Sequence, residues 1–230
     1  LRDLAYYQDD PMVKRLLGLN QLPDPSTISR ALSSIDGMSI VRVRGLCRSL
    51  VIERLKKVAI YRVTLDFDGS VFSTQSRTTE GTAIGYNRKK KGARSYYPLF
   101  CTLAQTGQVF DVYHRPGNVH DSHGAREFIL ACIKILKQEL PWLKIEVRMD
   151  SAFFSDEIVS ALDAMGIEFT LSVPFERFGE LKKRIQGRAR WRSMDETWSF
   201  FEAAWKPKKW KKGYRFLFIR QRCPIIRKEP

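Results

Sequence analysis

Apolar residues recur at helical spacing in the first quarter of the chain. The clearest run extends from Ser39 to about Lys56 and carries Ile40, Val43, Leu46, Leu50 and Ile52. A shorter helix is expected over residues 27–32, capped by Ser26 after a proline-rich break. We therefore predict a helical N-terminal region over residues 1–56. It serves either as a layer that contacts a ligand or as a layer that packs on the next domain.

Beyond Val58 the pattern changes from helical to alternating. Residues 63–68 alternate between an apolar set (Val63, Leu65, Phe67) and a polar set (Thr64, Asp66, Asp68). This alternation predicts a strand with one apolar face and one polar face. Two more strands are expected at residues 97–104 and 109–114, joined by a turn at residues 105–108.

The next segments alternate between helix and strand. We expect a helix that opens at Asp121 or Ser122 and ends before Pro141, then a strand over residues 144–149. A second helix, capped by Ser155 and closed by Gly166, leads to a strand over residues 168–173. Three strands followed by helix, strand, helix and strand predict an α/β fold with a partly parallel sheet.

The character of the chain changes again after Pro174. Residues 176–192 are basic and are expected to form a helix and a loop. Residues 197–205 and 214–220 read as paired strands joined by a lysine-rich link, which indicates a small β insertion. We therefore divide the chain into a helical region (1–56), an α/β core (57–175) and a basic β-rich insertion (176–230).

Two acids fall where strands end. Asp68 closes the first strand and Asp150 follows the fourth, each in phase with the polar positions of its strand. An aspartate at such a place, taken alone, is typical of a turn or a cap. If the two strands are neighbours, however, the carboxylates meet at one edge and repel each other. A divalent cation such as Mg²⁺ resolves that repulsion, because it prefers oxygen ligands.

Composition narrows the classes of protein. Apolar residues make up 43% of the sequence and aromatic residues 12%, which argues for a packed core rather than disorder. The longest apolar runs fall well short of the about 20 residues of a membrane span, so no membrane partner is expected. The net charge of +15 predicts a polyanionic partner, most simply nucleic acid, against the alternative of a merely soluble basic protein.

Cysteines and histidines add little chemistry. The spacing of the cysteines matches no zinc or redox motif, and Cys101 and Cys132 lie in apolar runs typical of a core. A reducing, cytoplasmic setting is the simplest account of them. The histidines cluster in a short stretch that is better explained as a loop near a binding surface than as a zinc site; they are His114, His120 and His123.

Basic residues gather in three groups, which favours contact with DNA phosphates over solvated loops. The first group is Arg88, Lys89, Lys90, Lys91 and Arg94. The second is Lys182, Lys183, Arg184, Arg188, Arg190 and Arg192. The third is Lys206, Lys208, Lys209, Lys211 and Lys212. Trp205 and Trp210 interleave with the third group, either to stack on exposed bases or to fill a core.

Five short motifs occur in a fixed order along the chain. They are Leu-Asp-Phe-Asp-Gly-Ser-Val (65–71), Tyr-Pro-Leu (97–99), Thr-Gly (106–107), Arg-Pro-Gly-Asn-Val-His (115–120) and Arg-Met-Asp-Ser-Ala-Phe-Phe (148–154). Together they resemble the DDE transposases of bacterial insertion sequences. The resemblance implies a ribonuclease-H-like mixed sheet with helices on both faces and two Mg²⁺ or Mn²⁺ ions. It also implies a homodimer on double-stranded DNA in the bacterial cytoplasm, associated with the nucleoid.

The resemblance also assigns site residues. Asp68 matches the first acid, with Asp66 as second choice, and Asp150 matches the second. The family's third acid lies in Tyr-x-x-Arg-x-x-x-Glu-x-x-x-x-x-x-Lys, a pattern absent from this sequence. We therefore expect that acid beyond Pro230 and expect this fragment to be inactive. The alternatives are a non-catalytic DNA-binding remnant of a transposase and a ribonuclease-H-like nuclease unrelated to transposition.

Overall fold

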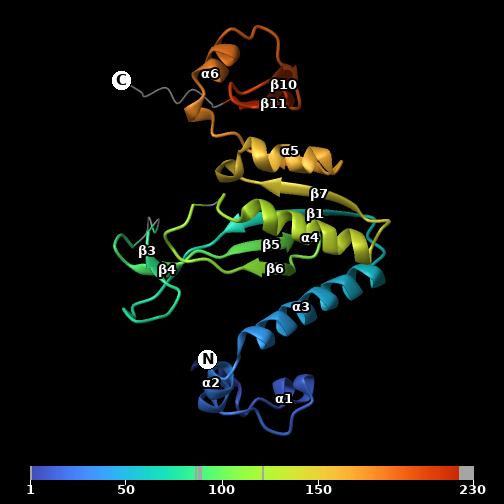
Figure 1. Ribbon diagram of the computed structural model, residues 1–230. Helices are drawn as coiled ribbons and strands as arrows, with labels where there is room; N and C mark the ends of the chain where they lie inside the picture. The colour runs from blue at the N-terminus through green and yellow to red at the C-terminus, as the bar shows by residue number, and fades with distance from the viewer. Residues whose placement is uncertain (1, 86, 88–89, 121, 223–230) are drawn as a thin grey trace, which may run out of the picture. The chain divides into compact units, whose positions relative to one another are not determined.

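The computed structural model describes residues 2–85, 87, 90–120 and 122–222 (Figure 1). Its contacts divide the chain into two units, Leu1–Leu50 and Val51–Pro230. The boundaries that we drew at residues 56 and 175 remain a prediction. Among the described helices, none combines the length and the apolar character that crossing a bilayer requires.

The first unit is helical, as expected. It holds η1 (Arg2–Tyr7), α1 (Pro11–Leu17), α2 (Pro25–Ser33) and the start of α3 (Gly37–Lys57). The predicted cap of α2 is wrong by two residues. The carboxylate of Asp24, not the hydroxyl of Ser26, caps the helix by accepting the Ser26 backbone N–H at 2.8 Å. Pro25 at the first helical position favours this start, because its fixed φ suits a helix and it has no N–H to satisfy.

A five-stranded mixed sheet forms the centre of the second unit. Its strands are β1 (Arg62–Gly69), β5 (Leu99–Leu103), β6 (Val109–Tyr113), β7 (Lys144–Met149) and β8 (Glu168–Leu171). Their order is β6-β5-β1-β7-β8. The pairs β1–β5 and β5–β6 are antiparallel, whereas β1–β7 and β7–β8 are parallel. The expected α/β fold with a mixed sheet is therefore confirmed.

Helices cover the apolar face of this sheet. They are α4 (Ala125–Glu139), which Figure 1 shows lying over the strands, α5 (Asp156–Ala164) and the end of α3. Phe67 of β1 meets Phe128 of α4 with ring centroids 5.9 Å apart. The buried side chains of these helices form one core cluster with the apolar positions of the strands. The opposite positions of β1 and β7 are polar, as the alternation predicts.

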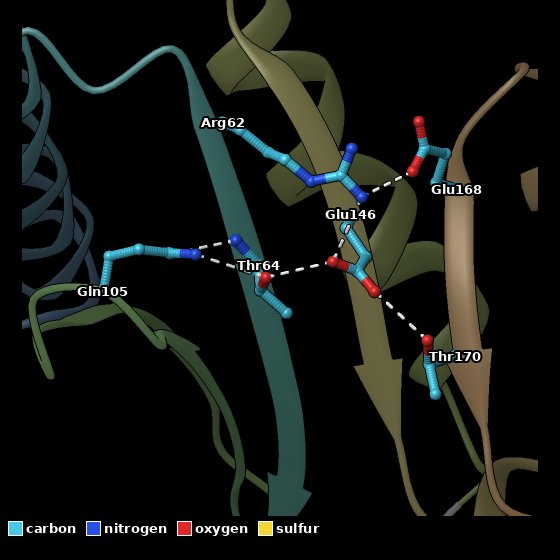
Figure 2. A network of polar contacts seen from close by, with 6 residues as sticks. All are labelled: Arg62, Thr64, Gln105, Glu146, Glu168 and Thr170. Atoms are coloured by element: carbon cyan, nitrogen blue, oxygen red, sulfur yellow. Dashed lines mark hydrogen bonds and ion pairs between the residues drawn. The ribbon is translucent and has the colours of Figure 1, made fainter. Parts of the chain in front are cut away.

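The polar face is held by a network that spans β1, β7 and β8 (Figure 2). Glu146 accepts hydrogen bonds from Thr64 at 3.2 Å and from Thr170 at 3.1 Å. Arg62 forms an ion pair with Glu168 at 2.5 Å, and this hydrogen bond raises the pKa of Arg62. These contacts fix the alignment of the parallel strands, whose ends carry the acids described below.

The first residues of α5 were predicted correctly from local sequence, whereas those of α4 were not. Ser155 caps α5 as predicted, because its Oγ accepts the Ile158 N–H at 3.3 Å. By contrast, α4 begins at Ala125 rather than at Ser122, and Asp121 lies outside the described residues. Its N-cap is Gly124, which has a left-handed φ of 67°. A side chain there would clash with the Tyr113 ring, 2.7 Å from a Cβ.

A second, smaller sheet went unpredicted. Its strands are β2 (Phe72–Ser73), β3 (Ala83–Ile84) and β4 (Arg94–Tyr96), in the order β2-β4-β3. Strands of two or three residues are too short to show an alternating pattern. This small sheet follows β1 directly and precedes β5, so it extends from the edge where Asp68 lies.

The two strands predicted after residue 196 are present, in a segment with a hydrophobic cluster of its own that we continue to call the insertion. It contains η3 (Phe175–Arg177), α6 (Gly179–Gln186), β9 (Arg192–Ser193), β10 (Trp198–Trp205) and β11 (Tyr214–Gln221). The strands form a sheet in the order β11-β10-β9. Leu181, Phe201, Trp205 and Phe218 are buried in the cluster.

The cysteines take the places that the sequence indicates. Cys101 and Cys132 are fully buried in the core of the central sheet, as predicted. Burial, and then the hydrogen bond with Cys132, raise the pKa of the Cys101 thiol. Cys47 is exposed on α3, and Cys223 lies outside the described residues.

Candidate active site

Asp68 and Asp150 lie at the same edge of the central sheet. The parallel register of β1 and β7 pairs Phe67 with Met149, and each acid is the next residue along its strand. Neighbouring strands are about 4.8 Å apart, so the two residues follow side by side. Both are exposed and in phase with the polar face. The predicted meeting of the two strand ends is therefore present in the structure.

A short turn holds Asp150 in place. Its carboxylate accepts the backbone N–H of Ala152 at 2.9 Å and so caps η2 (Ser151–Phe153). The turn ends in two aromatic residues with different surroundings. Phe153 is buried in the core of the central sheet, and the Phe154 ring stacks on Trp210 with centroids 4.7 Å apart. The turn that carries Asp150 is thus anchored at both the core and the insertion.

Asp66, our second choice for the first acid, has a different role. Its two carboxylate oxygens accept hydrogen bonds from the Arg148 guanidinium at 2.7 and 2.6 Å. This pairing raises the pKa of Arg148. A carboxylate held by both oxygens is poorly placed to bind a cation, because the guanidinium occupies the same lone pairs. Asp68 therefore stays the predicted first acid, with Asp66 engaged by Arg148.

The donor set at this edge fits one divalent cation. Two aspartates on adjacent, exposed strand ends offer the oxygen ligands that Mg²⁺ and Mn²⁺ take, and leave room for water and a phosphate oxygen. Within the described part of the chain, no group of three or more histidine, cysteine or acidic side chains is arranged around a common point. Two aspartates would hold a second ion weakly.

The loop between β6 and α4 is organised by a residue whose role the sequence did not reveal. Arg115 is only 1% exposed, and its guanidinium donates to the carbonyls of Tyr97 at 3.0 Å and His123 at 3.0 Å. A buried guanidinium bonded to several carbonyls fixes a loop firmly. The sequence feature that could have indicated this role is an arginine placed between a strand and a Pro-Gly pair. Because β6 and β1 run in the same direction, this loop leaves the edge that carries Asp68.

Two glycines let the small sheet approach that loop. A Cβ at Gly85 would lie 2.3 Å from the Gly117 carbonyl, and one at Gly117 would lie 2.6 Å from the Ser95 carbonyl. Tyr96 of β4 also bridges to Pro116. Backbones this close leave no space for a side chain. The small sheet is therefore attached to the β6–α4 loop through main-chain contact.

The predicted DNA-binding residues take several roles. The side chains of Lys90, Lys91, Lys208, Lys209 and Lys211 are exposed. Arg94 donates to the hydroxyl and the carbonyl of Thr82 at 2.9 and 2.5 Å and so braces the small sheet. Lys212 forms an ion pair with Asp163 of α5 at 2.7 Å, and that hydrogen bond raises the pKa of Lys212. Arg88 and Lys89 lie outside the described residues.

The two tryptophans pack inside the insertion. Trp205 is 3% exposed, and its ring lies 4.8 Å from that of Phe216. Trp210 stacks on Phe154 and also meets Tyr214. Of the two interpretations that the sequence left open, the core role therefore holds for Trp205. Trp210 is packed against rings rather than presented to a base.

Comparison with known proteins gives one decisive match. Residues 1–223 match the model of a family described as transposase DDE domain group 1. No curated protein matches the chain. Several solved transposase structures are distantly similar, two of which are a Mos1 and a piggyBac transposase. The Mos1 transposase paired-end complex with left transposon end has 12% identity and a TM-score of 0.36, over 80% of this chain and 69% of that one.

The second is the piggyBac transposase synaptic complex with hairpin DNA, at 15% identity and a TM-score of 0.39. The match covers 67% of this chain and 32% of the piggyBac transposase chain. Likenesses this weak carry no argument about the site. The family model, which spans nearly the whole chain, carries the assignment. The chain belongs to the transposase DDE domain group 1 family.

Proposed function

We propose that this chain is the catalytic core of a DNA transposase in which Asp68 and Asp150 hold a divalent metal ion for phosphoryl transfer at transposon ends. The observation that carries this assignment is the parallel register of β1 and β7, which brings the two acids to one edge. Family membership supplies the reaction class, which is cleavage and strand transfer of DNA.

In this proposal each side chain at the site has one role, either metal binding or positioning. Bound Mg²⁺ or Mn²⁺ would activate the attacking oxygen and stabilise the leaving oxygen. Asp68 and Asp150 would bind the ion, and the turn capped by Asp150 would orient its carboxylate. The ion pair with Arg148 would keep Asp66 out of the metal site. Arg115 would keep the neighbouring loop in the shape that the substrate meets.

The 230-residue chain is, in this proposal, a DNA-binding but non-cleaving form. Two ions acting on one phosphate need ligands on both, and the described residues supply two aspartates. Glu157 and Glu176 are engaged elsewhere, with Arg126 at 3.8 Å and Lys182 at 2.7 Å. Neither is therefore placed as a third acid.

The partner is double-stranded DNA, bound by a homodimer near the bacterial nucleoid. The net charge of +15 and the exposed lysines support the choice of DNA. The alternative of an unrelated ribonuclease-H-like nuclease is disfavoured, because the family model spans residues 1–223. A non-catalytic DNA-binding remnant remains the alternative from a different class, and a metal measurement separates the two.

The test is titration calorimetry with Mn²⁺ on the wild type, Asp68→Asn, Asp150→Asn and the control Asp66→Asn. Loss of either proposed ligand should weaken binding at least about tenfold, which is about 1.4 kcal/mol. The Asp66 control should bind like the wild type. Incubated with duplex DNA and Mg²⁺, the chain should bind the DNA without cutting it. Equal Mn²⁺ affinity in all four proteins would contradict the metal site, and Asp68-dependent cutting would contradict the inactivity.

A further inference from the structure

A hollow of about 640 Å³ opens on the insertion. Its lining residues come after both Asp68 and Asp150 in the sequence. It is lined by Arg188, Ala189, Arg190, Trp191, Arg192 and Arg220. We call Arg188, Arg190, Arg192 and Arg220 the arginine cluster. Three of its members come from the loop before β9 and from β9 itself, and Arg220 comes from β11. Among the residues that the structure describes, no carboxylate lines the hollow.

Aromatic rings hold two of these arginines in place. The Arg220 guanidinium lies 4.2 Å from the centre of the Trp191 ring, and its Nε donates to Ser199 at 2.8 Å. The Arg188 guanidinium lies 4.8 Å from the centre of the Phe201 ring. A guanidinium that stacks on a ring keeps its remaining N–H groups available. The insertion therefore presents arginines that are already ordered.

The loop itself is shaped by bonds within the cluster. Arg188 Nε donates to the carbonyl of Arg190 at 2.9 Å, and the indole N–H of Trp191 donates to the carbonyl of Arg188 at 3.1 Å. These contacts fold residues 188–191 back on themselves. They also bring the positively charged guanidinium groups close together. Their mutual repulsion is unfavourable unless an anion binds between them.

The described ion pairs leave this charge without a counter-ion. None of the ion pairs found among the described residues involves a member of the arginine cluster. The neighbouring Asp195 carboxylate accepts the backbone N–H groups of Thr197 and Trp198, both at 2.7 Å, and so shapes the next turn. The hollow is thus a concentrated site of positive charge on an ordered scaffold.

We propose that the arginine cluster binds the phosphate backbone of DNA, as a contact region separate from the lysines near residue 90. The proposal rests on the proposed function and adds a site to it. Guanidinium groups bind phosphate oxygens through two parallel hydrogen bonds. Trp191 has its N–H and one ring face engaged within the protein, so the site recognises the backbone rather than the bases. Binding here is consequently independent of sequence.

The main test is the salt dependence of duplex DNA binding, followed by fluorescence anisotropy. The variant is Arg190→Ala with Arg192→Ala, since among the described residues neither side chain is hydrogen-bonded or stacked on a ring. Losing two phosphate contacts should lower the slope of log affinity against log salt by about 2. The matched control is Lys134→Ala with Arg177→Ala, two exposed cations outside the cluster and outside the three basic groups, with the same change in net charge. The control should change the slope by less than about 0.5.

A second variant tests the ordering by rings. Arg220→Lys keeps the charge but loses the planar stack on Trp191. It should weaken DNA binding at least about threefold while the circular dichroism spectrum stays unchanged. Wild-type affinity in Arg220→Lys would overturn the role of the stacked guanidinium.

The outcomes separate this site from the proposed function. The first outcome is a wild-type salt slope in the Arg190→Ala, Arg192→Ala variant, while Lys90→Ala with Lys91→Ala still flattens the slope. That result would leave the proposed function standing and would overturn the arginine cluster as a DNA contact. Equal losses in the variant and its control would also overturn it, because they would reflect net charge only. If the wild type bound an acidic polyglutamate peptide more tightly than DNA, the nucleic-acid assignment would be wrong. Absence of any DNA binding by the wild type would contradict the proposed function itself.

Discussion

The central sheet and the insertion bury different kinds of side chain and present opposite charges. The core of the central sheet is mainly aliphatic, built on alternating positions such as Leu65 and Val147, and its edge carries Asp68 and Asp150. The insertion buries aromatic rings such as Phe201 and Trp205. An alternating strand can place carboxylates among the polar positions at its end, whereas aromatic ring faces hold guanidinium groups through cation–π contacts. One region is thus suited to a cation and the other to phosphates.

Phe154 joins the two regions four residues after Asp150. It follows Phe153, which is buried in the core, and its ring meets Phe178 with centroids 5.7 Å apart. The same ring stacks on Trp210 at 4.7 Å. The position of the second acid therefore depends on packing in the insertion as well as on β7.

The largest expected effect comes from truncating each cluster separately. Leu65→Ala in the central sheet, where the side chain is fully buried, should lower the free energy of unfolding by about 2–5 kcal/mol. Phe201→Ala should open the insertion locally, because its cluster is separate from the core of the sheet. Urea denaturation and amide hydrogen exchange on β7 would measure both. Loss of protection in β7 by Phe201→Ala would show that the two clusters unfold as one.

The same difference explains what the sequence could predict. The strands of the central sheet were found because Val63, Leu65 and Phe67 alternate with polar residues. The pairing of Asp68 with Asp150 was expected from strand ends alone, since parallel neighbours place their carboxyl ends at one edge. Periodic burial of this kind is a local property that is visible in a window of a few residues.

Other features depend on contacts that no local window contains. The small sheet has strands of two or three residues, and its position follows from close backbone contact between Gly85 and Gly117. The burial of Arg115 depends on carbonyls from two separate segments. Asp66 and Asp68 share one strand face, and only the partner strand shows that Arg148 engages Asp66. Such distinctions arise from tertiary structure.

A smaller effect is expected at the junction. Phe154→Ala removes ring contacts with Phe178 and Trp210 in a side chain that is only partly buried. It should lower the free energy of unfolding by about 1–2 kcal/mol. Because the turn after Asp150 loses one of its anchors, Mn²⁺ affinity should also fall by roughly threefold. Ser160→Ala on the outer part of α5 is the control, and calorimetry with urea denaturation measures both quantities. Unchanged Mn²⁺ affinity would mean that Phe153 alone fixes the turn.

The smallest effect is expected for the second acid on the β1 face. In Asp66→Asn the side chain keeps nearly the same size, and Arg148 is exposed enough to be solvated when its partner loses charge. Mn²⁺ affinity should therefore stay within about twofold of the wild type. The informative companion is Arg148→Met, which releases the Asp66 carboxylate two residues from Asp68 on the same strand face. If Asp66 is excluded from the metal site only by its ion pair, Arg148→Met should bind Mn²⁺ more tightly than the wild type, and the double variant should return to wild-type affinity. A loss of Mn²⁺ binding in Asp66→Asn as large as that in Asp68→Asn would instead make Asp66 a ligand and overturn the assignment of the first acid.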